Sequence, residues 1–367
     1  MKMKILPVGF SILLIASLIF FVSSVLYTIS KKRLSVPPLL GNGEENISSL
    51  HEDTVAPRPF SIFVVSDIQA SSYFERFYTA VDLPPETDFG VIVGDFCMDP
   101  RQEYHTFFIA EFNEWGLEFP ILLVPGNHDV AATDRDLARI NAFTRRDFEE
   151  TYGSRNFSFM HAGCYFIVID DVYNAEYLTH LENALAERPT GTLLTFVFMH
   201  IPPSSLCPLV RCRGIYEEER FFSIIDAYNV DYVVSGDFHS YLESEYNETV
   251  FLITGGGGAK LAGNPESSFH HAIVLHIDPA NRQVTETIYP IARRSDLPDD
   301  FKLFVMGDIY TIYRYNFPIF ASIILLHFVL LWLCYVLLRR DPHTRRRDER
   351  PGWLHQPIRL FPRDSRT

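Results

Sequence analysis

Five apolar runs in this sequence end on side chains suited to metal and phosphate chemistry. The runs have the length and the β-branched or aromatic content of buried strands. The polar residues at or just after their ends are Asp67, Asp95, Asn127, His128, Asp129, His200, Asp237 and His239. Ligands gather beyond the carboxyl ends of strands in open α/β sheets, so five such ends can converge on one site. A single buried Asp or His is commonly a helix cap or a satisfied core group, but five in series favour a shared site.

The order of these motifs resembles that of the calcineurin-like metallophosphoesterase superfamily, over about residues 60–290. Along the chain the motifs read Asp-x-x, Gly-Asp, Gly-Asn-His-Asp, His and Gly-x-x-His. The resemblance implies that Asp67 and His239 hold one metal ion and that Asp95 bridges two. It also implies that Asn127 and His200 hold the second ion.

The resemblance implies a mechanism as well. Two cations about 3.5–4 Å apart can deprotonate a bridging water and stabilise both oxygens of an in-line displacement at phosphorus. His128 would lie beside the leaving group and protonate it as general acid, and Asp129 would orient His128. The sequence has no Gly-x-Ser-x-Gly and no Gly-x-x-x-x-Gly-Lys motif, so no competing nucleophile or phosphate loop is expected.

Three positions depart from the family pattern. The usual Asp-x-His motif ends in Gln69, the usual Gly-His-x-His motif has Asp237 in place of its first His, and Met98 stands where a second carboxylate usually follows Asp95. An amide oxygen at Gln69 and a carboxylate at Asp237 can still bind metal. The expected ligands are therefore Asp67, Gln69, Asp95, Asn127, His200, Asp237 and His239.

This oxygen-rich set favours two divalent ions of manganese or iron over zinc, with magnesium also compatible. The closing region looks like the purple-acid-phosphatase-like bacterial branch of the superfamily, although Met98 replaces the iron-binding Tyr of true purple acid phosphatases. The alternative interpretation is a metallophosphoesterase-fold binding protein with weak or lost catalysis, since Asp237 can also reflect lost activity.

Alternating strand and helix patterns predict an α/β fold. Helices are expected at residues 74–81, 101–115, 136–151, 177–187 and 217–229. Short strands are expected at residues 156–159, 165–169, 250–254, 272–277 and 284–289. The resemblance implies two packed mixed β-sheets flanked by helices, to which one transmembrane helix is added at each end.

Two apolar runs, residues 5–29 and 317–338, are each about long enough to span a bilayer as a helix. A cleaved signal peptide is the alternative for the first run, but such peptides have a shorter apolar region and a better cleavage site. The predicted parts are a signal anchor (1–33), a linker (34–58), the metallophosphoesterase domain (59–296), a juxtamembrane segment (297–316), a transmembrane helix (317–338) and a basic tail (339–367).

Charge predicts the orientation of these spans. Residues 339–367 carry nine arginines against four acidic residues, whereas residues 34–316 carry 42 acidic and 18 basic residues. Basic flanks stay in the cytoplasm, so both termini are predicted to be cytoplasmic and the domain to lie in the periplasm, at the cell surface or in an organelle lumen. The acidic domain argues against nucleic acid. The expected partners are the membrane and a phosphoester or diphosphate substrate, with a lipid-linked substrate as one option.

The loop after His200 is long and irregular. Cys207 and Cys212 could close a small disulfide in an oxidising compartment or remain as two thiols. Arg211 and Arg213 are candidates for binding a substrate phosphate, with ordinary surface arginines as the alternative.

Overall fold

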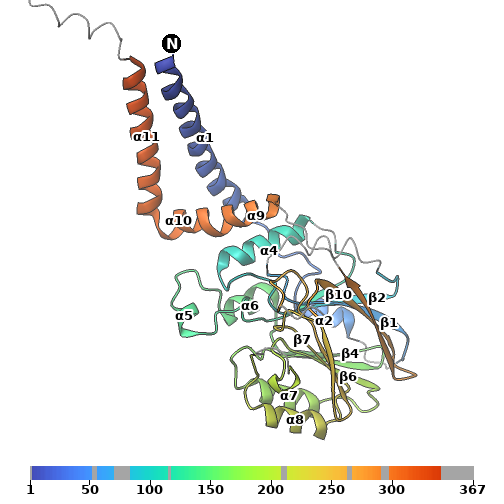
Figure 1. Cartoon of the computed structure of the whole chain (residues 1–367). Helices are drawn as coiled ribbons and strands as arrows, with labels where there is room; N and C mark the ends of the chain where they lie inside the picture. Colours follow the sequence, from blue (N-terminus) through green and yellow to red (C-terminus); the bar gives the residue numbers. More distant parts are fainter. Residues whose placement is uncertain are drawn as a thin grey trace, which may run out of the picture. The chain divides into compact units, whose positions relative to one another are not determined.

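The computed structural model describes residues 2–51, 56–69, 83–114, 117–207, 213–262, 267–290 and 297–339. The chain divides into two compact units (Figure 1). The larger unit comprises residues 24–316, and the smaller comprises residues 1–23 together with those from 317 onward. All of the strands in the described residues belong to the larger unit.

Two β-sheets form the centre of the larger unit. Their strand orders are β11-β10-β1-β2-β3 and β4-β5-β6-β7-β9-β8. The central strands of both sheets run parallel, and β10, β11, β4 and β8 pair antiparallel with their neighbours. The strands are β1 Phe60–Val65, β2 Thr87–Val93, β3 Ile121–Val124, β4 Phe157–His161, β5 Cys164–Val168, β6 Leu194–Phe198, β7 Tyr232–Ser235, β8 Leu242–Tyr246, β9 Thr249–Ile253, β10 His271–Asp278 and β11 Gln283–Pro290.

The helices of the larger unit lie mainly on the outer faces of the sheets. They are α2 Glu44–Leu50, α4 Gln102–Glu114, α5 Asp134–Leu137, α6 Arg145–Tyr152, α7 Tyr177–Ala186, the 3₁₀ turn η1 Ser204–Leu206, α8 Glu218–Ala227, α9 Leu297–Phe304, the π-helical turn η2 Val305–Ile309 and α10 Tyr310–Tyr315. The predicted single helix at 136–151 is wrong. Thr133 and Thr144 each accept a backbone N–H bond as an N-cap, so two short helices start there instead of one long one. The helix expected at 74–81 lies outside the described residues.

The side chains of β1 alternate between the two faces of its sheet, and both faces are buried. Phe60, Ile62 and Val64 pack between the two sheets, whereas Phe63 and Val65 pack toward α4 and α6. On the far side of the second sheet, side chains of β5 and β6 pack against α7 and α8. Strands covered on both faces read as continuous apolar runs, as these do. The predicted fold of two mixed sheets flanked by helices is confirmed.

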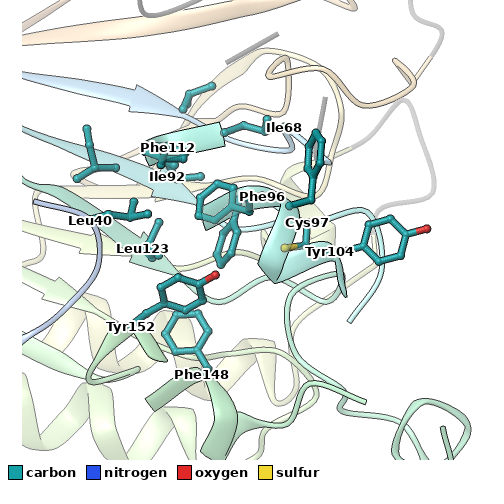
Figure 2. Close-up of a cluster of buried hydrophobic side chains, with 14 of the residues drawn as sticks. Leu40, Ile68, Ile92, Phe96, Cys97, Tyr104, Phe112, Leu123, Phe148 and Tyr152 are labelled. Carbon is teal, nitrogen blue, oxygen red and sulfur yellow. The ribbon is translucent and has the colours of Figure 1, made fainter. Parts of the chain in front are cut away.

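An aromatic cluster fixes α4 and α6 against the first sheet. Figure 2 shows the rings of Phe148 and Tyr152 next to each other, in the same cluster as Phe96 and Leu123. The ring centroid of Phe96 lies 4.5 Å from that of Phe108 and 5.7 Å from that of Tyr152. Contacts of this density hold the loop after β2 in one position.

The smaller unit contains most of α1 (Lys2–Lys31) and all of α11 (Phe317–Arg339). Both helices are long and apolar enough to cross a membrane, over Leu6–Lys31 and Phe317–Arg339. Within this unit the ring of Phe21 contacts Phe320 and His327, and His327 Nε2 lies 3.0 Å from the hydroxyl of Ser17. A polar pair between apolar helices fixes which faces meet. The orientation deduced from charge stays a prediction.

Candidate metal centre

The carboxyl ends of four parallel strands bring the expected ligands together. Asp67 follows β1, Asp95 follows β2, His200 follows β6, and Asp237 with His239 follows β7. His239 Nε2 lies 3.0 Å from Asp67 Oδ1, and His200 Nε2 lies 3.2 Å from Asp95 Oδ1 and 3.8 Å from Asp237 Oδ1. These five side chains therefore face one small volume.

The five side chains form two overlapping groups. Asp67, Asp95 and His239 offer one ligand atom each within 4.8 Å of one another, and so do Asp95, His200 and Asp237. Asp95 belongs to both groups. This is the arrangement that two neighbouring cations sharing one carboxylate would require.

Unsatisfied polar atoms test whether metal ions fit this site. Asp67 Oδ1, Asp95 Oδ2, Asn127 Oδ1 and His200 Nε2 are buried and accept no hydrogen bond. Buried polar atoms are normally paired, because an unpaired one costs about 1–3 kcal/mol. Four such atoms at the ends of neighbouring strands are explained if each binds a cation. The residues present therefore fit a metal centre.

The charges of the site also favour bound metal ions. Burial disfavours the charged form of His239, but the adjacent carboxylate of Asp67 outweighs it and raises the pKa of His239 to about 9. Burial raises the pKa of Asp237, which lies near His200, Arg213 and two further carboxylates. Three carboxylates gathered in a buried site need compensating positive charge, which divalent ions supply more effectively than protons.

The backbone at the ligands is strained. Asp67, Gln69, Asp95, Asp237 and His239 all adopt left-handed conformations, with φ between 50° and 58°. Non-glycine residues rarely occupy this region, and each such residue costs about 1–3 kcal/mol. The surrounding packing must hold them there, so the chain itself fixes the conformation of these expected ligands.

Gly126 provides a test of this close packing. A Cβ at this position would lie 2.1 Å from Asp95 N and 2.3 Å from Asp95 Oδ1. We expect Gly126→Ala to displace Asp95, to destabilise the fold by about 1–3 kcal/mol and to lower bound metal. Metal content per chain and the thermal unfolding midpoint measure both effects.

Gly43→Ala is the matched control for Gly126→Ala. Gly43 has a φ of −64°, and its added methyl group would meet no atom within 4 Å. This control should lose no metal and less than about 1 kcal/mol of stability. Normal metal content in Gly126→Ala would show that the loop yields without moving Asp95.

His128 and Asp129 have different surroundings from those expected. His128 donates its backbone N–H to Asp95 Oδ1 (2.8 Å), and its ring Nδ1 lies 2.6 Å from the carbonyl oxygen of Met98. The carboxylate of Asp129 accepts the backbone N–H groups of Asp95, Cys97 and Gly126. The orienting partner of the His128 ring is thus the Met98 carbonyl, and Asp129 holds the backbone around Asp95.

The remaining predicted site residues are distributed as follows. Gln69 donates its backbone N–H to the Asp95 carbonyl, which places it beside the centre. Arg213 Nη1 lies 3.7 Å from Asp237 Oδ1, and the guanidinium lies 5.4 Å from the ring centroid of Tyr173. Cys207 is disulfide-bonded. Arg211 and Cys212 lie outside the described residues.

Two buried residues that had no assigned role hold the ligand loops. The carboxylate of Asp171 accepts the backbone N–H groups of His200 and Ile201 at 2.9 and 2.8 Å. Asp171 follows β5, so the strand-end pattern that identified the ligands could also have identified it. His105 Nε2 lies 2.9 Å from the carbonyl oxygen of Asp129, and burial lowers the pKa of this histidine to about 3, so the neutral ring donates there. Its position inside a helix gave no such signal.

Comparison with known proteins agrees with this geometry. The family model for calcineurin-like phosphoesterases matches residues 60–241, a range that includes all seven expected ligands. The chain contains a calcineurin-like phosphoesterase domain. Membership of this family supports the conclusion that the protein is a metal-dependent phosphoesterase. A search of curated proteins found no match.

Solved structures resemble this phosphoesterase chain at low identity. Purple acid phosphatase PPD1 from yellow lupin (Lupinus luteus) seeds has 15% identity and a TM-score of 0.47, over 68% of this chain and 56% of that one. A dimetal phosphatase from Danio rerio has 11% identity and a TM-score of 0.41, over 64% and 99%. GAP50, the anchor in the inner membrane complex of Plasmodium, has 13% identity and a TM-score of 0.41, over 68% and 96%. The chain thus spans little more than half of the lupin enzyme.

Proposed function

We propose that this protein is a membrane-anchored, two-metal phosphoesterase that hydrolyses an extracytoplasmic phosphoester or diphosphate. The observation that carries the proposal is the pair of ligand groups sharing Asp95, with buried unpartnered atoms directed at the same place. The apolar helices α1 and α11 support the anchoring. Spans at both ends would hold the domain near lipid, which favours a lipid-linked substrate.

The metals would be held mainly by oxygen. The proposed ligands are Asp67, Gln69, Asp95, Asn127, His200, Asp237 and His239. Five oxygen donors and two imidazoles favour manganese or iron over zinc, with magnesium also compatible. When bound, such ions activate water and stabilise the negative charge that develops at phosphorus.

His128 would supply the proton for the leaving group. Its Nδ1 is occupied by the Met98 carbonyl, so Nε2 is the nitrogen left for substrate. Nε2 lies 3.9 Å from Asp95 Oδ2, and the side chain is 38% exposed, so it borders the metal centre and is open to an incoming substrate. A protonated ring in this position can protonate the departing oxygen from Nε2.

Arg213 would bind the phosphate. It lies next to Asp237 and over the ring of Tyr173, which together limit its motion. We expect Arg213→Ala to raise KM about tenfold while lowering kcat less, because a charged hydrogen bond to substrate is lost. Arg220→Ala is the control, since Arg220 pairs with Glu182 and Glu217 elsewhere on the surface. An unchanged KM in Arg213→Ala would remove Arg213 from the substrate site.

One experiment separates catalysis from the alternative, a binding protein with this fold. The full chain is purified in detergent with manganese, and its metal content and its turnover of p-nitrophenyl phosphate and the bis ester are measured. Asn127→Ala and His128→Ala are measured alongside. We expect about two metal ions per chain and turnover that falls in Asn127→Ala. Equal residual turnover in all three proteins would favour the binding protein.

A further inference from the structure

The segment before α11 forms one continuous helical rod on the larger unit. α9, η2 and α10 follow one another without a break from Leu297 to Tyr315, and they lie across α4 (Figure 1). Only Asn316 separates the end of this rod from the start of α11 at Phe317. If α11 crosses the membrane, the rod ends at the bilayer surface.

One side of the rod is fixed to α4. Lys302 pairs with Glu111 and Glu114 of α4, at 3.2 and 3.1 Å. Burial and the nearby carboxylate of Glu103 raise the pKa of Tyr315, which places the Tyr315 hydroxyl close to α4. Met306 is fully buried. These contacts fix the rotation of the rod about its own axis, and hence which residues it turns outward.

The last turns of α1 reach the same place. Within the larger unit, Lys31 pairs with Glu114 at 2.7 Å, and the ammonium group of Lys32 lies 5.3 Å from the ring centroid of Tyr310. Thr28 of α1 is fully buried, and Tyr27 of α1 packs against the core cluster that contains Phe107 and Phe108 of α4. The chain therefore enters the domain from α1 and leaves it toward α11 beside α4 and the rod. If both helices cross the membrane, these two connections keep α4 and the rod near it.

The outward side of α9 carries three large apolar residues, with the exposed Asp300 among them. Leu297, Phe301 and Phe304 are 75%, 52% and 47% exposed, and we call these three residues the α9 face. Lys302 on the same helix is turned inward to α4. A helix on the surface of a soluble domain usually turns its large apolar residues inward. Exposed aromatic residues in this arrangement are typical of helices that lie in a membrane interface.

We propose that the α9 face inserts into the lipid bilayer and holds the domain against the membrane surface. The partner is lipid and not protein, because the rod continues directly into α11 and the end of α1 packs beside it. A helix lying in the interface buries its apolar side about 5–10 Å into the boundary between head groups and acyl chains. Asp300 and Asp308, exposed on the same rod, would remain at the level of the head groups.

Photocrosslinking tests the α9 face in the full-length chain, reconstituted into phosphatidylcholine vesicles. Phe301 and Phe304 are replaced singly by p-benzoylphenylalanine, a change of similar shape at exposed positions. Ile140, which is 78% exposed in the domain, is the negative control, and Leu325 of α11, 64% exposed, is the positive control. Mass spectrometry after irradiation should find about tenfold more lipid adduct at 301 and 304 than at 140.

The controls separate the possible failures. Lipid adduct at 325 without adduct at 301 or 304 would overturn the inference while leaving the membrane anchor intact. Absence of adduct at 325 as well would overturn both. Equal adduct at 140, or crosslinks from 301 and 304 to a second copy of the chain, would also overturn it. Metal content measured on each variant shows that the domain is folded.

Discussion

Asp95→Asn should release both metal ions and lower turnover of p-nitrophenyl phosphate by about 10³-fold. Among the described residues, Asp95 is the one carboxylate that belongs to both ligand groups. The amide keeps the shape of the side chain and can still accept the backbone N–H of His128, so the loop should stay in place. It lacks the negative charge and the second strong oxygen ligand that two cations share. Metal content per chain and steady-state turnover are the measurements.

Asp134→Asn is the matched control for Asp95→Asn, because Asp134 is exposed in the short helix α5 and belongs to neither ligand group. It should leave metal content and turnover unchanged. Thermal unfolding gives an independent readout, since manganese at about 100 times its Kd should stabilise the wild-type fold by about 2.7 kcal/mol. Asp95→Asn should show little of this stabilisation. Two tightly held ions in Asp95→Asn would exclude Asp95 as the shared ligand.

The part of the site that was predictable from sequence is the part that follows from strand ends. Each of Asp67, Asp95, His200 and Asp237 comes within two residues of the end of an apolar run, and parallel strands place such ends at one edge. The same pattern predicted the layers, because strands buried on both faces lack the polar alternation of a surface strand. Local sequence patterns were sufficient to predict the features that depend only on a residue and its neighbours in sequence.

Contacts between distant residues were not predictable in this way. Asp129 could have been assigned to His128 or to the backbone of Asp95, and only the path of the loop after β2 decides between them. The ring of His105 stacks on that of Phe143, 38 positions away, with 3.4 Å between the centroids. This contact positions His105 to bond the Asp129 carbonyl in the loop that contains Asn127. The outward direction of Phe301 likewise depends on Lys302 meeting Glu111.

The position of Asp237 indicates what its replacement of the usual histidine does to the site. Its carboxylate belongs to one of the two groups that could hold a metal ion, 3.8 Å from His200 Nε2, and Arg213 stands beside it. Two divalent ions carry four positive charges, and Asp237 adds a third carboxylate to Asp67 and Asp95 in offsetting them. The exchange from imidazole to carboxylate thus keeps a ligand atom in place, which supports a working site with harder metal ions.

His128→Ala should lower kcat by roughly 10²- to 10⁴-fold for phosphoesters of alkyl alcohols, and by less than about tenfold for p-nitrophenyl phosphate. An alkoxide needs a proton as it departs, whereas p-nitrophenolate is stable without one. Metal content should not change, because the contact of His128 with Asp95 is made by the backbone N–H, which alanine keeps. The measurement is kcat for both kinds of substrate together with metal content.

The ratio between the two substrates is the decisive quantity for His128. A residue that only supports the fold would reduce both rates equally, and so would a residue whose loss releases metal. His180→Ala is the matched control, since His180 is exposed on α7, and it should change neither rate. Equal losses for both substrates in His128→Ala, with metal retained, would mean that the leaving oxygen obtains its proton from water. Loss of metal would instead place the His128 ring among the ligands, where its Nε2 would have to approach Asp95 more closely than 3.9 Å.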